Sequence, residues 1–260
     1  MKIKATLFCL VFLLISSGFI LAQNVNELIK QGDELIDNFN NQEALERYLQ
    51  ADKISPNNWE VNWRISRAYV NIANQMPANT GDQEDDQLAV YQKALDYADK
   101  AVSIAPDKSA TYLRRAIANG KIALFKGVFS VAGVVNKVRE DIVKAIQLGN
   151  GGDYVQSLCH YVLGRTHAKV SEKWKPARAI LGLGWGDIEI AIEEYKKAIK
   201  LNSDFRMFYL DLARAYIEED EYKLARQNLK IVPTKPKLEE DDDKRIEEAK
   251  KLLVEIEDED

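Results

Sequence analysis

The chain has 260 residues, of which 46% are hydrophobic and 30% are charged, a composition typical of a soluble folded protein with one or two domains. Its formal net charge is -5, but residues 238–260 alone hold twelve acids and four bases, so the body of the chain, residues 23–237, is nearly balanced. A balanced body has no basic footprint for a nucleic acid, and we expect no nucleic-acid partner.

The N-terminus differs in composition from the rest of the chain. Lys2 and Lys4 precede an uncharged apolar run over residues 5–20, which Leu21-Ala22-Gln23 follows. This layout predicts a secretory signal peptide over residues 1–22 and a secreted or periplasmic protein. The alternative is an uncleaved membrane anchor through residues 5–22, because a helix of that length reaches about 27 Å, just short of a ~30 Å hydrocarbon core.

Cysteine usage follows from the signal peptide. Cys9 lies inside the apolar run, so cleavage leaves Cys159 as the only cysteine and no internal disulfide can form. A lone thiol on a helix is predicted to be a small buried hydrophobe rather than a nucleophile.

The first half of the mature chain repeats one helical pattern. Residues 25–58 form the first unit, and the second closes near Pro106 after an extra sixteen residues that include the turn-rich run 76–82. The third unit is the weakest, its two helices look over-long, and it ends at the glycine-rich run 149–152, a predicted helix C-cap.

The pattern is clearest from Asp187 to Val232. Small residues such as Ala198 and Ala213 are predicted at close helix crossings, with tyrosines filling the spaces beside them, and Asp187 is a predicted N-cap. The fourth unit starts near Ser157 and has an insertion over residues 174–186, and the fifth runs from Arg206 to about Pro236. A small residue occupies the same first-helix position of every unit: Gly32, Ser66, Ala116, Gly164 and Ala213. The period of about 34 residues is the tetratricopeptide pattern.

The predicted fold is therefore all-α, a right-handed α-solenoid of about five tetratricopeptide-like hairpins. The repeat domain covers residues 23–237, and residues 238–260 form an acidic C-terminal capping helix and tail. A stripe of Ile246, Ala249, Leu253 and Ile256 gives that helix one apolar face for the last repeat, as a solenoid end requires.

Some residues point to a particular family. Trp63-Arg64 with Arg67-Ala68, the Leu163-Gly164-Arg165 step, and the long insertions in the second and fourth units resemble the regulator of microtubule dynamics family over roughly residues 40–253. The resemblance implies a non-enzymatic helical-repeat protein that binds proteins, in some members with membrane attachment or lipid contact. A cleaved signal peptide would put microtubules out of reach, so the family's name is not carried over as a function.

No pattern of catalytic, cofactor-binding or metal-binding residues is present, and we expect no enzyme activity, cofactor or metal. His160 and His167 are seven residues apart on one helix, about 10 Å, which is too far to share a metal ion, and we expect them to pack. The glycine-rich run 182–186 lacks the strand and the third glycine position of a dinucleotide site. It is predicted to be a flexible insertion pinned by Trp185.

Five residues are candidates for partner binding on the concave face, which the first helix of each repeat lines. Arg67, Arg165 and Arg214 occupy equivalent positions, and Trp63 and Tyr161 lie one turn earlier in two of the helices. Stacked together, they would form a groove with cationic and aromatic side chains, suited to carboxylates, phosphates or an acidic peptide. The alternative is that each arginine pairs with a glutamate of a neighbouring repeat.

We therefore expect a scaffold that binds a protein or peptide, of acidic character, in its groove. The alternative function is a membrane-anchored module that binds lipid or another amphiphile, which the apolar stretch from Ile122 to Val135 could admit. A membrane contact is expected only if the N-terminal segment is retained or lipid is the ligand. The acidic runs 239–243 and 255–260 flank the capping helix, and one of them could fold back toward the groove rather than remain solvated.

The N-terminal segment gives a direct prediction. Mass spectrometry of the protein purified from its native host is expected to find a mature chain that starts at Gln23, because a peptidase cleaves after the small residue Ala22. A chain that retains Met1 would support the membrane anchor instead.

Overall fold

The computed structural model describes residues 24–125 and 128–260, with side chains at 24–125 and 131–260. The predicted signal peptide therefore lies outside the described residues. Every regular element within them is helical, and no strand occurs there, which confirms the all-α prediction. None of the helices described is long and apolar enough to cross a bilayer.

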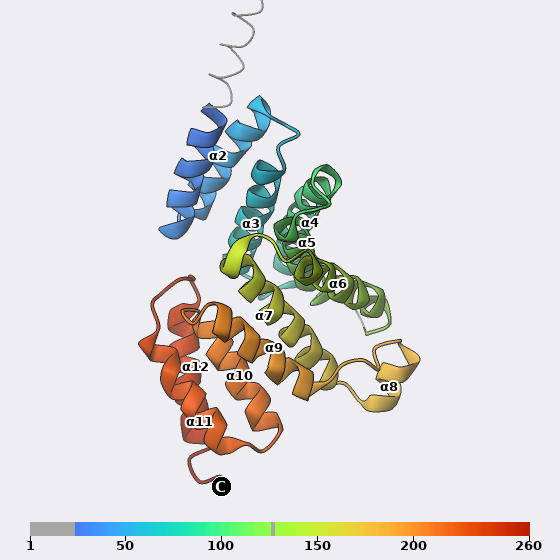
Figure 1. The fold of residues 1–260 in the computed structure, drawn as a ribbon, viewed down its shortest axis with the longest axis vertical. Coiled ribbons are helices and arrows are strands. Elements are labelled where there is room, and N and C mark those ends of the chain that lie inside the picture. The colour runs from blue at the N-terminus through green and yellow to red at the C-terminus, as the bar shows by residue number, and fades with distance from the viewer. Residues whose placement is uncertain (1–23, 126–127) are drawn as a thin grey trace, which may run out of the picture.

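Five antiparallel hairpins and a capping helix confirm the predicted solenoid (Figure 1). The hairpins pair a helix over residues 24–37 with α2 (Asn41–Ile54), α3 (Trp59–Gln75) with α4 (Gly81–Ile104), α5 (Ser109–Ala123) with α6 (Val128–Leu148), α7 (Gly152–Ser171) with α9 (Ile188–Leu201), and α10 (Arg206–Glu218) with α11 (Tyr222–Ile231). The remaining elements are α8 (Lys175–Ile180), the 3-10 helix η1 (Val232–Thr234) and α12 (Asp242–Glu255).

The small residues lie where the sequence pattern predicts close crossings. A Cβ atom added at Gly164 would lie 3.0 Å from the Ala191 carbonyl oxygen and 3.0 Å from the Tyr195 ring, so α7 and α9 approach too closely for a larger residue. At Gly32 an added Cβ would lie 2.3 Å from the Tyr48 ring. These contacts fix the register between the two helices of a hairpin.

The insertions adopt structures that the sequence only partly predicted. Most of the extra residues of the second unit lengthen α4, because Thr80 caps that helix by accepting from the Gln83 amide, and only residues 76–80 form the loop. In the third unit α6 is long, whereas α5 has an ordinary 15 residues. The prediction of two over-long helices there was therefore wrong for α5.

Trp185 pins the fourth-unit insertion to the repeats, as predicted. Its Nε1 donates to Asn136 Oδ1 at 2.8 Å, the Arg139 guanidinium lies 4.9 Å from its ring centroid, and His167 packs edge-on against it. Asp187 caps α9 by accepting from the Ile190 amide, which confirms the predicted N-cap.

The solenoid curls until its two ends lie on the same side of the molecule. In Figure 1 the first hairpin, in blue, and α12, in red, face each other across a gap, while α8 projects from the opposite side. The capping prediction is confirmed, because Ala249 and Ile256 of the apolar stripe are buried against the last repeat.

Two glycine substitutions test the crossing. Gly164→Ala is expected to destabilise the fold by about 1–3 kcal/mol because the added methyl group is overpacked. Gly120→Ala is the matched control, since an added Cβ there meets no atom within 4 Å. It should instead stabilise α5 by about 0.5–1 kcal/mol through helix propensity. Urea unfolding followed by circular dichroism measures both, and equal stability of the two variants would contradict the assigned crossing.

Candidate functional site

The first helices of the repeats form one continuous inner face. The structure places α3 against α5, α5 against α7, α7 against α10 and α10 against α12. Charged and aromatic side chains of neighbouring helices contact one another along this face, as Arg114 and Trp63 do between α5 and α3, and Tyr161 and Asp211 between α7 and α10. Helical repeats of this kind use such extended concave surfaces for binding.

In the C-terminal half of this face, charged side chains pair with one another. Tyr161 donates from its hydroxyl to Asp211 Oδ2 at 2.7 Å and accepts from Arg165 at 3.1 Å. Arg214 pairs with Asp211 and, across the repeat boundary, with Glu248. Three of the five candidate residues therefore lie in one network centred on the buried carboxylate of Asp211.

Burial and the negative charge of Asp211 raise the pKa of the Tyr161 hydroxyl far above its usual range. Tyr161 thus stays protonated and acts as a donor to Asp211. Arg165 is exposed, and its neighbours Tyr161 and Asp211 raise its pKa. The network is suited to holding the helices in register and presenting charge, not to abstracting a proton at neutral pH.

The N-terminal half of the face differs, because two of its arginines, Arg67 and Arg114, form no ion pair within the described chain. Trp63 and Arg67 are half-buried on α3, and within the described chain Arg67 forms neither a hydrogen bond nor an ion pair. The Arg64 guanidinium lies 4.3 Å from the Trp63 ring centroid and pairs with Asp33 at 2.9 Å. A second guanidinium, that of Arg114 on α5, lies 5.3 Å from the same ring centroid.

The structure therefore separates the five candidates into two groups. Tyr161, Arg165 and Arg214 share the Asp211 network, whereas Trp63 and Arg67 lie with Arg114 at the other end of the inner face. For Arg214, the internal pairing considered as an alternative is present in the structure. For Arg67 no such pairing exists among the described residues.

The segment before α12, residues 235–241, crosses from the last repeat to the first two, and we call it the strap. Arg206 donates to the Lys235 carbonyl oxygen at 2.6 and 2.9 Å at one end. At the other end, the buried carboxylate of Asp242 accepts from the backbone amides of Leu238 and Glu239 at 2.8 and 2.9 Å. The strap is thus held at one end by α10 of the last repeat and at the other by the first residue of α12.

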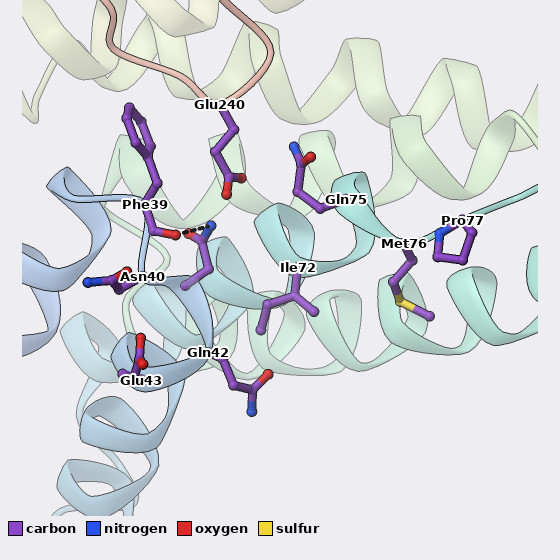
Figure 2. Close-up of a pocket in the computed structure, with 10 residues that line it drawn as sticks. Phe39, Asn40, Gln42, Glu43, Ile72, Gln75, Met76, Pro77 and Glu240 are labelled. Atoms are coloured by element: carbon purple, nitrogen blue, oxygen red, sulfur yellow. Dashed lines mark hydrogen bonds between the residues drawn. The ribbon is translucent and has the colours of Figure 1, made fainter.

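The middle of the strap touches the N-terminal hairpins. Lys237 Nζ lies 5.7 Å from the Phe39 ring centroid, and Figure 2 shows Glu240 pointing toward Gln75 and the turn at Phe39. Glu240, Phe39 and Gln75 line a shallow pocket of about 450 Å³ together with Asn40 and Met76. Of the two acidic runs that flank the capping helix, the first, which begins in the strap, therefore folds back onto the N-terminal hairpins.

Lys121 of α5 lies close enough to the strap for the strap's acids to act on its charge. Burial, and then the positive charge of Arg165, lower its pKa to about 8, while Glu239 and Asp241 of the strap act in the opposite direction. Within the described chain, its ammonium forms no ion pair with a carboxylate. Lys121 is a half-buried cation whose charge the native structure disfavours.

Possible metal ligands do not cluster among residues 24–125 and 131–260. No three histidine, cysteine or carboxylate side chains gather there in a way that could hold a metal ion. His160 Nδ1 lies 2.6 Å from Glu194 Oε2, and His167 is buried against Trp185, so both histidines pack as predicted. Cys159 is fully buried, and burial raises the pKa of its thiol to about 12.

Sequence reasoning missed Arg114, Lys121 and Asp211. A signal for Arg114 was present, because it precedes the small residue of its repeat by two positions, as Arg64 does. The weakness of the third repeat obscured that register. No sequence signal marked Lys121, since its neighbours come from α7, the strap and α12.

The fold and the inner face together define a helical-repeat protein of the tetratricopeptide type. The chain belongs to the family described as Regulator of microtubule dynamics protein 1-3, whose model matches residues 28–257. No curated protein matches the sequence.

Solved structures of tetratricopeptide proteins share the fold. The chain resembles TTC0263 of Thermus thermophilus with a TM-score of 0.61 and 15% identity, over 86% of this chain and 98% of that one. It also resembles pilF of Pseudomonas aeruginosa, with a TM-score of 0.55 and 13% identity over 81% and 76% of the two chains. At these identities the likeness establishes the fold alone.

The buried lysine predicts a pH dependence of stability. A lysine whose pKa in the folded chain is about 8, below its ordinary 10.5, penalises the native state fully below pH 8. That penalty disappears as the pH rises from about 8 to 10.5, because in this range the unfolded chain binds more protons than the native chain. Lys121→Met keeps the apolar stem and removes the charge, so it should be more stable than the wild type near neutral pH, and the gap should close toward pH 10.

Comparing Lys121→Met with the wild type cancels the contributions that other titrating groups make to the pH dependence of stability. Cys159 acts in the opposite direction, since its raised pKa penalises the native state at alkaline pH, but it does so equally in both chains. Urea unfolding at a series of pH values measures the gap. A gap that stays constant from pH 7 to pH 10 would show that Lys121 is solvated in the native chain.

Proposed function

We propose that the protein is a non-enzymatic scaffold that binds a protein or peptide partner along its inner face. The observation that carries this proposal is the state of Arg67. It is half-exposed beside the half-buried Trp63, and within the described chain it lacks the carboxylate partner that Arg214 has. An indole ring and a guanidinium held ready on rigid helices are the side chains that most often dominate binding energy at interfaces.

The partner we propose is acidic where it meets α3. Arginine recognises carboxylates with two parallel hydrogen bonds, and a cationic surface inside a groove also steers acidic ligands. The wall of the groove is built from helices that packing holds in place, so little binding energy is lost in ordering it. We further propose that binding takes place outside the cytoplasm, in keeping with the predicted signal peptide.

A pull-down experiment tests the groove. The chain from Gln23 to Asp260, immobilised and exposed to an extract of its host, should lose its specific partners when Arg67→Glu and Arg165→Glu are combined. An interface hot spot is worth about 2 kcal/mol or more, so quantitative mass spectrometry should show at least a tenfold loss. Circular dichroism should remain that of the wild type.

Arg47→Glu is the matched control, because Arg47 is exposed on α2 and bonds only to Gln50 among the described side chains. It reverses one charge away from the inner face and should leave capture unchanged. Equal capture by the groove double variant and the control would remove the inner face as the binding site.

A further inference from the structure

Arg114 has an unusual environment for an arginine. It is 8% exposed on α5, and its Nε is buried without a hydrogen-bond partner. The Trp63 ring centroid lies 5.3 Å from its guanidinium, and the Tyr154 side chain, the thiol of Cys159 and the guanidinium of Arg67 are close enough to act on its charge. Burial, and in part the positive charge of Arg67, lower the pKa of Arg114 to about 10.

No carboxylate balances this pair of cations among residues 24–125 and 131–260. The next residue on the same helix, Arg115, shows the ordinary arrangement, since it pairs with Asp141 at 2.6 Å and with Asp99 at 3.4 Å. Neither Arg67 nor Arg114 forms an ion pair within the described chain. Burying a charge without a counter-charge is costly, and the cost rises when a like charge lies beside it.

The strap does not supply the missing anion. Its Glu239 pairs with Arg245 at 2.8 Å, and its Glu240 points toward Gln75 and the turn at Phe39. The acids of the strap are thus engaged at the other cations and amides of the inner face. The surface beside Arg114 nevertheless reaches solvent, because Trp63 and Arg67 are partly exposed and Tyr154 is 40% exposed.

We propose that Arg67 and Arg114 form an anion subsite that receives a side-chain carboxylate of an acidic peptide, with the Trp63 ring as its apolar wall. The subsite rests on the proposed function, since the peptide runs along the inner face. A carboxylate there accepts hydrogen bonds from the two guanidiniums and restores charge balance. An apolar side chain beside that carboxylate packs on the indole.

Two features favour a peptide carboxylate over a phosphate group of a lipid. The subsite lies between α3, α5 and α7, walled by Trp63 and Tyr154, where an extended chain fits more readily than a bilayer surface. The neighbouring cations already meet carboxylates of this same chain, at Asp33 and at Glu239. The inner face is thus already built to recognise carboxylates at other points.

The proposal predicts that replacing Arg114 weakens peptide binding without lowering the stability of the fold. Arg114→Met keeps the length of the side chain and removes the buried charge, so the variant should melt at the same temperature as the wild type or higher. The same variant should lose peptide binding. An arginine with a structural role would behave in the opposite way, because its replacement would lower the melting temperature.

The binding experiment uses a fluorescein-labelled peptide of alternating leucine and aspartate, with asparagine in place of aspartate as the control peptide. Fluorescence anisotropy should show at least tenfold tighter binding of the aspartate peptide by the wild type. Arg114→Met and Arg67→Met should each abolish that preference, while Arg47→Met, on the exposed side of α2, should retain it. The aspartate peptide should also raise the melting temperature of the wild type but not that of Arg114→Met.

Each other outcome overturns the subsite. Equal binding of the two peptides, or a lower melting temperature of Arg114→Met together with unchanged preference, would show that the two arginines do not hold a carboxylate. Binding of inorganic phosphate or of phosphatidylserine vesicles in place of the peptide would reassign the subsite to phosphate. Capture of partners from the extract that survives Arg114→Met but not the groove double variant would leave the proposed function intact and remove the subsite alone.

Discussion

The close crossing of helices within each hairpin is the constraint on which the rest of this structure depends. At Gly164 the backbone of α9 approaches so closely that one added methyl group would touch both Ala191 and Tyr195. Because protein interiors are packed to crystal-like density, such a contact allows only one register between two helices. The register decides which side chains of neighbouring repeats meet, and so the position of a glycine on α7 helps to bring Tyr161 and Arg165 to Asp211 of α10.

The charges of the inner face are arranged around that register in two different ways. In the C-terminal half, one buried carboxylate, Asp211, accepts from Tyr161 and pairs with Arg214, so three helices share a balanced network. In the N-terminal half, Arg67 and Arg114 lie beside Trp63 with no carboxylate of the described chain to balance them. The burial of apolar side chains on α3 and α5 can offset the free-energy cost of this unbalanced pair of charges. In the function that we propose, an anionic ligand therefore gains most by binding at this unbalanced half.

The fold could be predicted from the sequence because helical repeats are recognised by the regular spacing of their small and large apolar residues. The small residues from Gly32 to Ala213, the Asp187 cap and the role of Trp185 all depend on local or periodic relations, which one sequence displays. The site was harder to predict, because it depends on contacts between residues far apart in the chain. Lys121, for example, meets Arg165 and the strap only after the solenoid has curled, and no spacing in the sequence encodes that meeting.

The strap changes how the charge of the chain should be interpreted. From composition, residues 238–260 form a strongly acidic tail that would repel an acidic partner. In the structure, the acids nearest the groove are already paired, Glu239 with Arg245 and Asp242 with the strap's own amides, and both ends of the strap are fixed. Charges engaged in short ion pairs and amide bonds contribute a field that falls off rapidly with distance in salt solution. In the binding mode that we propose, an acidic peptide approaching α3 is therefore attracted by the unpaired Arg67 and Arg114 more strongly than it is repelled by the strap.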